Sequence, residues 1–324
     1  MSAVLARRSA IGLALAGCAT AARAQPAFPN RPIRLVVPFA AGSATDIRAR
    51  LFGQQMSADW GQPVVVDNRG GANGFLAAEA VARAAPDGYT LLFTSNSTHG
   101  SNPALFRRLP YDPIADFAPI SLIGVAVNFV VVNNALPIRT LRDLIDYAKA
   151  HPGALNFASG SASSRAAGEL FKSMAGVAMT NVAYRANPQA LTDVVAGNAQ
   201  VMFADSTTVT PQIREGRVRA LAVTSRQRAP TFPDIPTVEE AGGLAGYEML
   251  NWAAVYAPAG TPPDIVARLN GKFVELAALP AIRDKLREDG TEPRTSTPEE
   301  LARFTASEIA KWREIVAAAR IEVE

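Results

Sequence analysis

The sequence predicts an α/β fold of two lobes, in which helices flank largely parallel sheets. Short runs rich in β-branched residues alternate with helical stretches of about 10–16 residues, which is the pattern of a parallel sheet covered by helices. Two longer apolar segments interrupt this alternation. Of the 324 residues, 48% are hydrophobic and 19% are charged, so the chain can fill the cores of two lobes.

Short strands and two helix starts can be placed from local patterns. We expect the strands at Ile33–Val37, Val64–Val66, Thr90–Thr94, Leu155–Ala158, Val201–Ala204 and Ala220–Thr224. Thr140 and Asp143 resemble a capping box, and Thr297 and Glu300 form a complete one with Pro298 at the first helical position. The helix that follows carries an apolar stripe expected to pack in the core: Leu301, Phe304, Ile309, Trp312, Ile315 and Val316.

The two long apolar segments are Ile120–Asn133 and Met249–Pro258. Neither has helix-capping residues, both contain valine and aromatic residues, and each is long enough to leave one sheet and enter another. We interpret them as two crossover strands. Lobe 1 is then expected to hold residues 25–127 and 251–324, and lobe 2 residues 128–250, with the return crossing between 225 and 252. The alternative is that both segments are buried strands of a single sheet.

The net charge of +3 arises entirely from the first 24 residues, where Arg7, Arg8 and Arg23 occur without an acidic residue. This stretch is typical of an export signal, because a basic start is followed by the apolar segment Ala10–Ala16 and then by small residues. We predict that residues 1–24 are a signal peptide and that the exported protein is formally neutral. Since no basic tract remains, nucleic acid is not an expected partner.

Two refinements stay open at this end of the chain. Arg7 and Arg8 resemble a twin-arginine export signal, whereas Leu15-Ala16-Gly17-Cys18 resembles a lipobox, in which Cys18 would carry a lipid and become the mature N-terminus. Cys18 is the single cysteine, so neither a disulfide within one chain nor a cysteine-based metal site is expected. No run of 18 apolar residues follows, so we expect a periplasmic protein that is soluble or tethered only at its end.

Small polar residues cluster where four of the predicted strands end. In open α/β sheets, ligands bind at this carboxyl edge. Helix N-termini there offer unpaired N–H groups and a partial positive charge, and hydroxyl side chains add further donors. The clusters therefore favour a small ligand with carboxylate groups, held mainly by neutral donors. They are Ala41–Asp46, Ser95–Ser101, Ser159–Ser164 and Ala204–Thr208.

Each cluster taken alone has a simpler interpretation, because Ser, Thr, Asn and Asp are the common N-cap residues of helices. Asp46 is expected to shape its loop by capping the helix that begins near Ile47. Asp205 is either another cap or a carboxylate that binds the ammonium group of an amino acid ligand. The repetition of polar clusters, more than any one of them, indicates a binding site.

No catalytic constellation stands out, and we predict that the protein is not an enzyme. His99 and His151 are the only histidines, and His99 lies in a Ser/Thr-rich segment, so a Ser–His hydrolase is kept as an alternative. The sequence contains no Gly-x-Ser-x-Gly elbow, His-Glu-x-x-His, P-loop or Gly-x-Gly-x-x-Gly motif, and the spacing of the glycine-rich segment Arg69–Gly74 does not match a nucleotide site. We expect no catalytic residue, cofactor or metal.

Eight segments spread over the mature chain are similar to one known family. They are Pro29–Ile33, Val37–Asp46, Val66–Gly74, Pro86–Leu91, Asn102–Phe106, Ala167–Lys172, Leu221–Thr224 and Ile235–Gly242. Together they resemble the Bug (TctC-like) extracytoplasmic solute receptors, the substrate-binding component of tripartite tricarboxylate transporters. The resemblance runs from about Phe28 to the C-terminus.

The resemblance implies a two-lobed periplasmic binding protein of type II-like fold, a monomer that closes on a small carboxylated ligand and delivers it to a membrane permease. A receptor that presents its ligand to a signalling partner is the alternative. By the same resemblance, the ligand-binding residues are Phe39, Ala41, Gly42, Ser43 and Asp46; Ser95, Asn96, Ser97 and Thr98; Ser159, Gly160, Ser161 and Ser164; and Asp205.

The chain departs from the family pattern at two places. Arg165 stands where the family usually has histidine, and Ala183-Tyr184-Arg185-Ala186 stands where it has Pro-Tyr-Lys-Gly. Arg165 is expected either to contact a second carboxylate of the ligand or to be a solvated helix residue.

Overall fold

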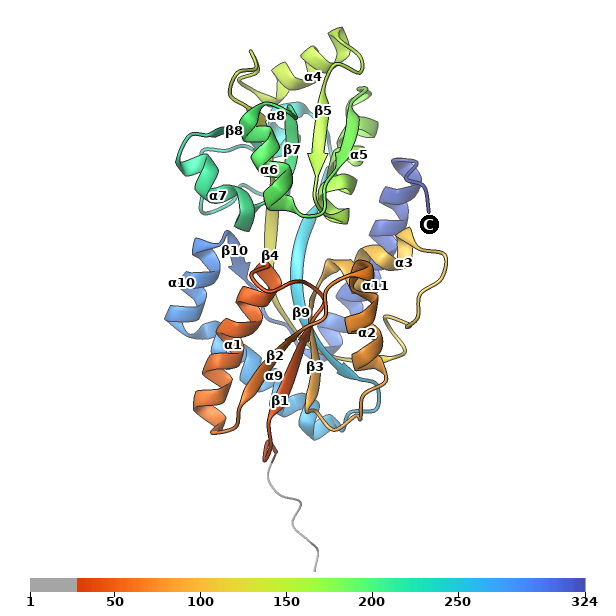
Figure 1. Ribbon diagram of the computed structural model, residues 1–324, viewed down its shortest axis with the longest axis vertical. Coiled ribbons are helices and arrows are strands. Elements are labelled where there is room, and N and C mark those ends of the chain that lie inside the picture. Colours follow the sequence, from red (N-terminus) through yellow and green to blue (C-terminus); the bar gives the residue numbers. More distant parts are fainter. Residues whose placement is uncertain (1–27, 324) are drawn as a thin grey trace, which may run out of the picture.

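The computed structural model describes residues 28–323, so the predictions for the signal peptide and for Cys18 lie outside the described residues. Figure 1 shows two lobes connected by long strands. In chain order the elements are β1 (Ile33–Val37), α1 (Ala44–Trp60), β2 (Val64–Asn68), η1 (Ala72–Gly74), α2 (Phe75–Ala82), β3 (Thr90–Ser95), η2 (Ser97–Ser101), α3 (Asn102–Leu105), β4 (Phe117–Asn133), α4 (Leu141–Ala150), β5 (Asn156–Ser159), α5 (Ala162–Ala175), β6 (Thr180–Ala183), α6 (Asn187–Ala196), β7 (Val201–Asp205), α7 (Ser206–Arg214), β8 (Val218–Val223), α8 (Val238–Gly242), β9 (Leu250–Pro258), α9 (Pro263–Ala278), α10 (Pro280–Glu288), β10 (Thr291–Pro293) and α11 (Pro298–Ala318).

Two sets of strands share β4. The first set runs in the order β2-β1-β3-β9-β4, and β10 also pairs with β4. The second set continues from β4 through β7, β5 and β6, and β8 also pairs with β4. The pairs of β1 with β2 and β3, and of β5 with β6 and β7, are parallel, whereas the pairs that involve β4 or β9 are antiparallel. The predicted α/β class is therefore confirmed.

Strand β4 changes its partners at one point along its length. Residues up to Val127 pair with β9, and from Asn128 onward the strand pairs with β7 and β8. The predicted crossover segment Ile120–Asn133 is thus part of one strand that runs from the lower lobe of Figure 1 into the upper one. Strand β9 pairs with the first set, and just before it the backbone N–H of Met249 donates to the carbonyl of Thr224 at 2.9 Å.

The last helix, α11, contributes to the cores of both lobes. Near its start Leu301 is buried in the same cluster as Trp252, and further along Trp312 and Ile315 are buried with Phe171 of α5. The stripe predicted on this helix is therefore core, as expected. The predicted capping boxes at the starts of α4 and α11 are both present.

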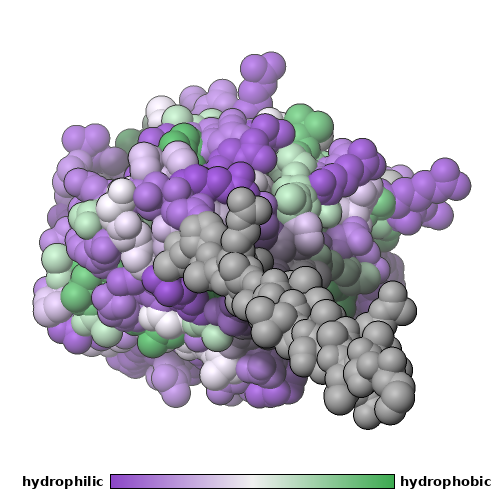
Figure 2. Space-filling model, turned by 90° about the horizontal axis from the view of Figure 1, so that it is seen from below, coloured by the Kyte–Doolittle hydropathy of each residue, from purple (hydrophilic) through white to green (hydrophobic). Residues whose placement is uncertain are grey.

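Hydrophobic side chains fill both faces of each sheet, where they form four clusters of buried residues. The face of the lower lobe seen in Figure 2 is by contrast mostly hydrophilic, with scattered hydrophobic residues. Within residues 28–323, no helix is long and apolar enough to cross a bilayer.

Candidate ligand-binding site

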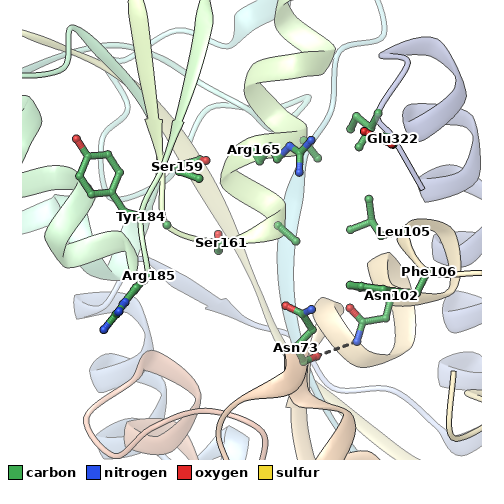
Figure 3. Close-up of a pocket in the computed structure, with 15 residues that line it drawn as sticks. Asn73, Asn102, Leu105, Phe106, Ser159, Ser161, Arg165, Tyr184, Arg185 and Glu322 are labelled. Atoms are coloured by element: carbon green, nitrogen blue, oxygen red, sulfur yellow. Dashed lines mark hydrogen bonds between the residues drawn. The ribbon is translucent and has the colours of Figure 1, made fainter. Parts of the chain in front are cut away.

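A pocket of about 270 Å³ lies between the lobes, next to the third polar loop. Small-molecule sites usually have volumes of about 300–1,000 Å³, so this pocket suits a small ligand. One wall comes from the β5–α5 loop, from α5 and from the end of β6, and the opposite wall comes from η1, α3 and the last residues of the chain (Figure 3). The lining residues are Asn73, Asn102, Leu105, Phe106, Ser159, Gly160, Ser161, Ala162, Arg165, Ala166, Ala183, Tyr184, Arg185, Ile321 and Glu322.

The third polar loop supplies three of the predicted site residues to the pocket: Ser159, Gly160 and Ser161. Ser161 caps α5, because its hydroxyl accepts a hydrogen bond from the backbone N–H of Ser164 at 3.2 Å. The hydroxyl of Ser164 points elsewhere and donates to the carbonyl of Phe203 at 2.7 Å. Ser164 therefore supports the loop from behind and does not line the pocket.

Gly160 is held in place by the start of α6. Its backbone N–H donates to Oδ1 of Asn187 at 3.1 Å. There is no space for a side chain here, because a Cβ atom would overlap the backbone of Ala186 and Asn187. Nδ2 of Asn187 also donates to Oδ2 of Asp205 at 2.6 Å, so Asn187 connects the third polar loop to the fourth. Sequence reasoning missed Asn187, and no local pattern marks it.

Asp205, the predicted residue of the fourth loop, is the N-cap of α7. Its Oδ1 accepts a hydrogen bond from the backbone N–H of Thr208 at 2.9 Å, and the hydroxyl of Thr208 lies 2.9 Å from both carboxylate oxygens. With Asn187 at Oδ2, both oxygens have partners, and Asp205 is not among the residues that line the pocket. These contacts favour the capping interpretation.

The first polar loop is organised by Asp46, which is buried. Its Oδ2 accepts from the backbone N–H of Gly42 at 2.8 Å and from Nε of Arg50 at 3.1 Å, and its Oδ1 accepts from Nδ2 of Asn68 at 2.9 Å. Burial alone would raise the pKa of Asp46, but the hydrogen bonds from these three partners outweigh it and hold the pKa below its ordinary value. Ser43 caps α1. Asp46 thus shapes the loop as expected, but the prediction that it caps the helix was wrong, because α1 begins at Ala44 and Asp46 lies in its first turn.

The remaining residues of this loop lie at the end of α1 that faces the other lobe (Figure 1). Phe39 packs against the core of its own lobe, while Ala41 and Gly42 are exposed. The pocket in Figure 3 is lined by none of the five predicted residues of the first loop.

The second polar loop forms the π-helical turn η2, and none of its predicted residues lines the pocket. Asn96 is buried, and its Nδ2 donates to the hydroxyl of Ser163 on α5 at 3.0 Å, which is a contact between the lobes. The hydroxyl of Ser95 donates to that of Ser97 at 3.3 Å. The pocket instead receives Asn102, from α3 directly after this turn.

His99 is enclosed in the core and is not placed for catalysis. Its ring stacks on Tyr256 with centroids 4.0 Å apart, and its Nδ1 lies 2.9 Å from the hydroxyl of Thr98. Burial lowers the pKa of His99 to about 3, so the ring is neutral at physiological pH. The hydroxyl beside it belongs to a buried threonine, and neither group lines the pocket.

Charged groups at the pocket come mainly from residues that the family resemblance did not carry over. Arg165 and Arg185 line it from one lobe, and Glu322 lies across from them. Arg165 and Arg185 were noted as departures from the family pattern, whereas the C-terminal residues gave no signal. Asn73 lies in the glycine-rich segment, within the part Val66–Gly74 that resembles the family, but it was not among the predicted site residues. Among residues 28–323, no group of three or more His, Cys, Asp or Glu side chains is placed to hold a metal ion.

Comparison with known proteins identifies the family. Residues 48–321 match the model of the tripartite tricarboxylate transporter family receptor, TctC. The chain belongs to this family. TctC proteins are extracytoplasmic solute receptors and not enzymes, so this protein is a periplasmic solute receptor of the two-lobed type.

Two relatives illustrate the similarity in sequence. The chain is 38% identical over 319 residues to the UPF0065 protein in the tcbD-tcbE intergenic region of Pseudomonas sp. strain P51, which covers 97% of this chain and 95% of that protein. It is 35% identical over 309 residues to BugT of Bordetella pertussis, with 94% of each chain covered. The TctC receptor described here thus matches these relatives over nearly their whole length.

Solved structures show the same similarity in three dimensions. Rpa4515 of R. palustris with adipate superposes with a TM-score of 0.85 at 36% identity and covers 91% of this chain and 99% of its own. MatC (Rpa3494) from Rhodopseudomonas palustris with bound malate superposes with a TM-score of 0.80 at 35% identity. The match covers 89% of this chain and 100% of the MatC chain. The fold of the TctC receptor is therefore that of periplasmic binding proteins.

Proposed function

We propose that this receptor binds a small carboxylated metabolite in the pocket between its lobes and delivers it to a membrane permease of the tripartite tricarboxylate transporter type. The pocket carries the proposal, because both lobes line it and its polar groups are mainly hydroxyls, amides and two arginines, with one exposed glutamate, Glu322, at its edge. Such groups donate hydrogen bonds to a carboxylate. The adipate and malate in the structures of Rpa4515 and MatC support the same ligand class.

Within the pocket, we propose that Ser159, Gly160 and Ser161 contact the ligand. The other predicted residues would act from behind, by holding the loops in place. Asn96 does so through its bond to Ser163, and Asp205 through its bond to Asn187.

We also propose that the lobes comprise residues 25–127 with 251–324 and residues 128–250, and that they move about the point where β4 changes partners. Three segments are joined there. The backbone N–H of Asn128 donates to the hydroxyl of Thr224 at 2.9 Å, and Nδ2 of Asn251 donates to Oδ1 of Asn128 at 2.7 Å. Hinge closure around a ligand is the usual motion of two-lobed receptors.

Titration calorimetry of the purified protein tests the ligand class. The panel would hold adipate, malate, aromatic acids, acidic amino acids and the amides of these acids. We expect at least one carboxylate to bind with one-to-one stoichiometry and its amide to bind far more weakly. Binding of none of them, together with esterase or amidase turnover that His99→Ala abolishes, would overturn the proposal.

The state of the N-terminus is decided by the intact mass of the mature protein. We propose cleavage after Ala24, which leaves a diffusing periplasmic receptor. A mass that corresponds to a chain beginning at a lipidated Cys18 would show that the receptor is tethered to the membrane.

A further inference from the structure

We propose that Arg165 binds a second anionic group of the ligand, so that the receptor prefers a dicarboxylate to a monocarboxylate of the same length. This inference rests on the proposed function and specifies what one end of the same pocket recognises.

Arg165 and the third polar loop lie at two ends of the pocket. Arg165 is on α5, four residues after Ser161, which corresponds to about 6 Å along the helix axis. In Figure 3 the guanidinium of Arg165 lies toward Leu105 and Glu322, away from Ser159 and Ser161. The hydroxyl of Ser159 donates to Oδ1 of Asn181 at 2.7 Å, whereas that of Ser161 accepts from Ser164 and keeps its own proton to donate. A ligand that extends along the pocket therefore meets the hydroxyl of Ser161 at one end and a guanidinium at the other.

The guanidinium of Arg165 lacks a partner within residues 28–323. Its Nε atom is closed to solvent and has no hydrogen bond, and the side chain makes no ion pair with the acidic residues described. Buried polar groups of this kind are rarely left unpaired. The two terminal nitrogens of the same guanidinium are not closed off in this way. A carboxylate in the pocket would pair with them, because arginine matches the two oxygens of a carboxylate in bidentate geometry.

The rest of the lining suits a dianion with a short apolar middle. Two arginines and one glutamate line the pocket, which leaves it net positive, and the glutamate, Glu322, is exposed at its edge. Leu105, Phe106 and Ala166 also line the pocket and offer apolar surface to methylene groups. A second carboxylate thus finds a guanidinium with which no acidic side chain of the described residues forms an ion pair within 4.0 Å.

Calorimetric titrations with matched acids test this inference. The probes are adipate against hexanoate and succinate against butyrate, at constant ionic strength. The proteins are the wild type, Arg165→Gln, Arg165→Lys and the control Arg139→Gln, which removes an exposed arginine before α4. Thermal unfolding of each variant shows that it is folded.

We expect the wild type to bind the better dicarboxylate about 10- to 100-fold more tightly than its monocarboxylate, because a hydrogen bond to a charged group contributes that much affinity. Arg165→Gln should remove this preference and leave monocarboxylate affinity within about twofold, since the loop at the other end is unchanged. Arg165→Lys should retain part of the preference, because it keeps the charge without the bidentate geometry. Arg139→Gln should behave as the wild type does.

Three results would overturn the inference. Equal weakening of both acids in Arg165→Gln would show a structural role, and an unchanged preference would show that the second carboxylate lies elsewhere. In both cases carboxylates still bind, so the proposed function stands. If the wild type binds no acid of either kind, the proposed function fails together with the inference.

Discussion

Asn187 donates a hydrogen bond to Asp205 at 2.6 Å and so ties the start of α6 to the start of α7. The same side chain accepts a hydrogen bond from the backbone N–H of Gly160. The wall of the pocket is therefore positioned by a residue that does not line it. Positioning of this kind lowers the cost of ordering the site when a ligand binds.

Removing Asn187 should loosen that wall. In Asn187→Ala, Gly160 and Asp205 both lose a partner, and we expect ligand affinity to fall about 3- to 10-fold, which corresponds to the net contribution of one hydrogen bond. Calorimetry with the ligand that the panel identifies measures the change. Asn134→Ala, which removes an exposed amide bonded to Gly216, is the matched control and should leave affinity unchanged. Equal affinities for the wild type and Asn187→Ala would contradict the positioning role.

Gly160→Ala should be more damaging, because its Cβ atom would overlap the backbone of Ala186 and Asn187. Forcing an atom into a packed site costs about 1–3 kcal/mol of unfolding free energy. We also expect ligand binding to fall below detection, since the loop must move. Gly271→Ala on α9 is the control: its Cβ meets no atom within 4 Å, and it should stabilise the protein by about 0.5–1 kcal/mol. Chemical unfolding curves measure both effects.

Asp205 should act on stability and not on ligand selectivity. Loss of the N-cap of α7 in Asp205→Ala should lower the unfolding free energy by about 0.5–2 kcal/mol, and Asp205→Asn should cost less because Asn also caps helices. Both variants should weaken acidic amino acids and plain dicarboxylates by the same factor. A loss in Asp205→Asn confined to amino acid ligands would instead support contact with an ammonium group.

Burial of His99 should make stability depend on pH. The pKa of His99 is about 3 in the folded protein, against an ordinary value of 6.5. Between these values the unfolded chain binds a proton that the folded protein does not. The unfolding free energy should therefore fall as the pH falls below 6.5, by up to about 1.4 kcal/mol per pH unit from this group.

Urea unfolding of the wild type and of His99→Phe between pH 7.5 and 5 isolates the contribution of His99. The phenylalanine keeps a ring against Tyr256 but does not titrate. The unfolding free energy of the wild type minus that of His99→Phe should fall as the pH falls below 6.5, and it should stay constant above pH 6.5. A constant difference over the whole range would show that His99 titrates normally.

The features that the sequence predicted well depend on residues that lie close together in the chain. The capping boxes at Thr140 and Thr297 and the N-cap Asp205 are visible because a cap and its partner lie three residues apart. β4 was visible because a long apolar run without caps can only be a buried strand here.

What the sequence did not predict depends on contacts between distant segments. Asn187 reaches Asp205 only after two helices have packed side by side, and Glu322 reaches the pocket only because α11 ends beside the other lobe. Neither position carries a local pattern. Hydroxyl and amide side chains in and beside η2 suggest ligand donors, yet burial of the turn directs Asn96 and Thr98 to partners inside the protein.

A crystal structure of the receptor with its tightest-binding acid shows whether the ligand binds between the lobes at the third polar loop. We expect one carboxylate of the acid within hydrogen-bond distance of Ser159, Gly160 or Ser161, enclosed between the two lobes. An acid bound on the outer surface, or between the lobes but away from these three residues, would contradict it.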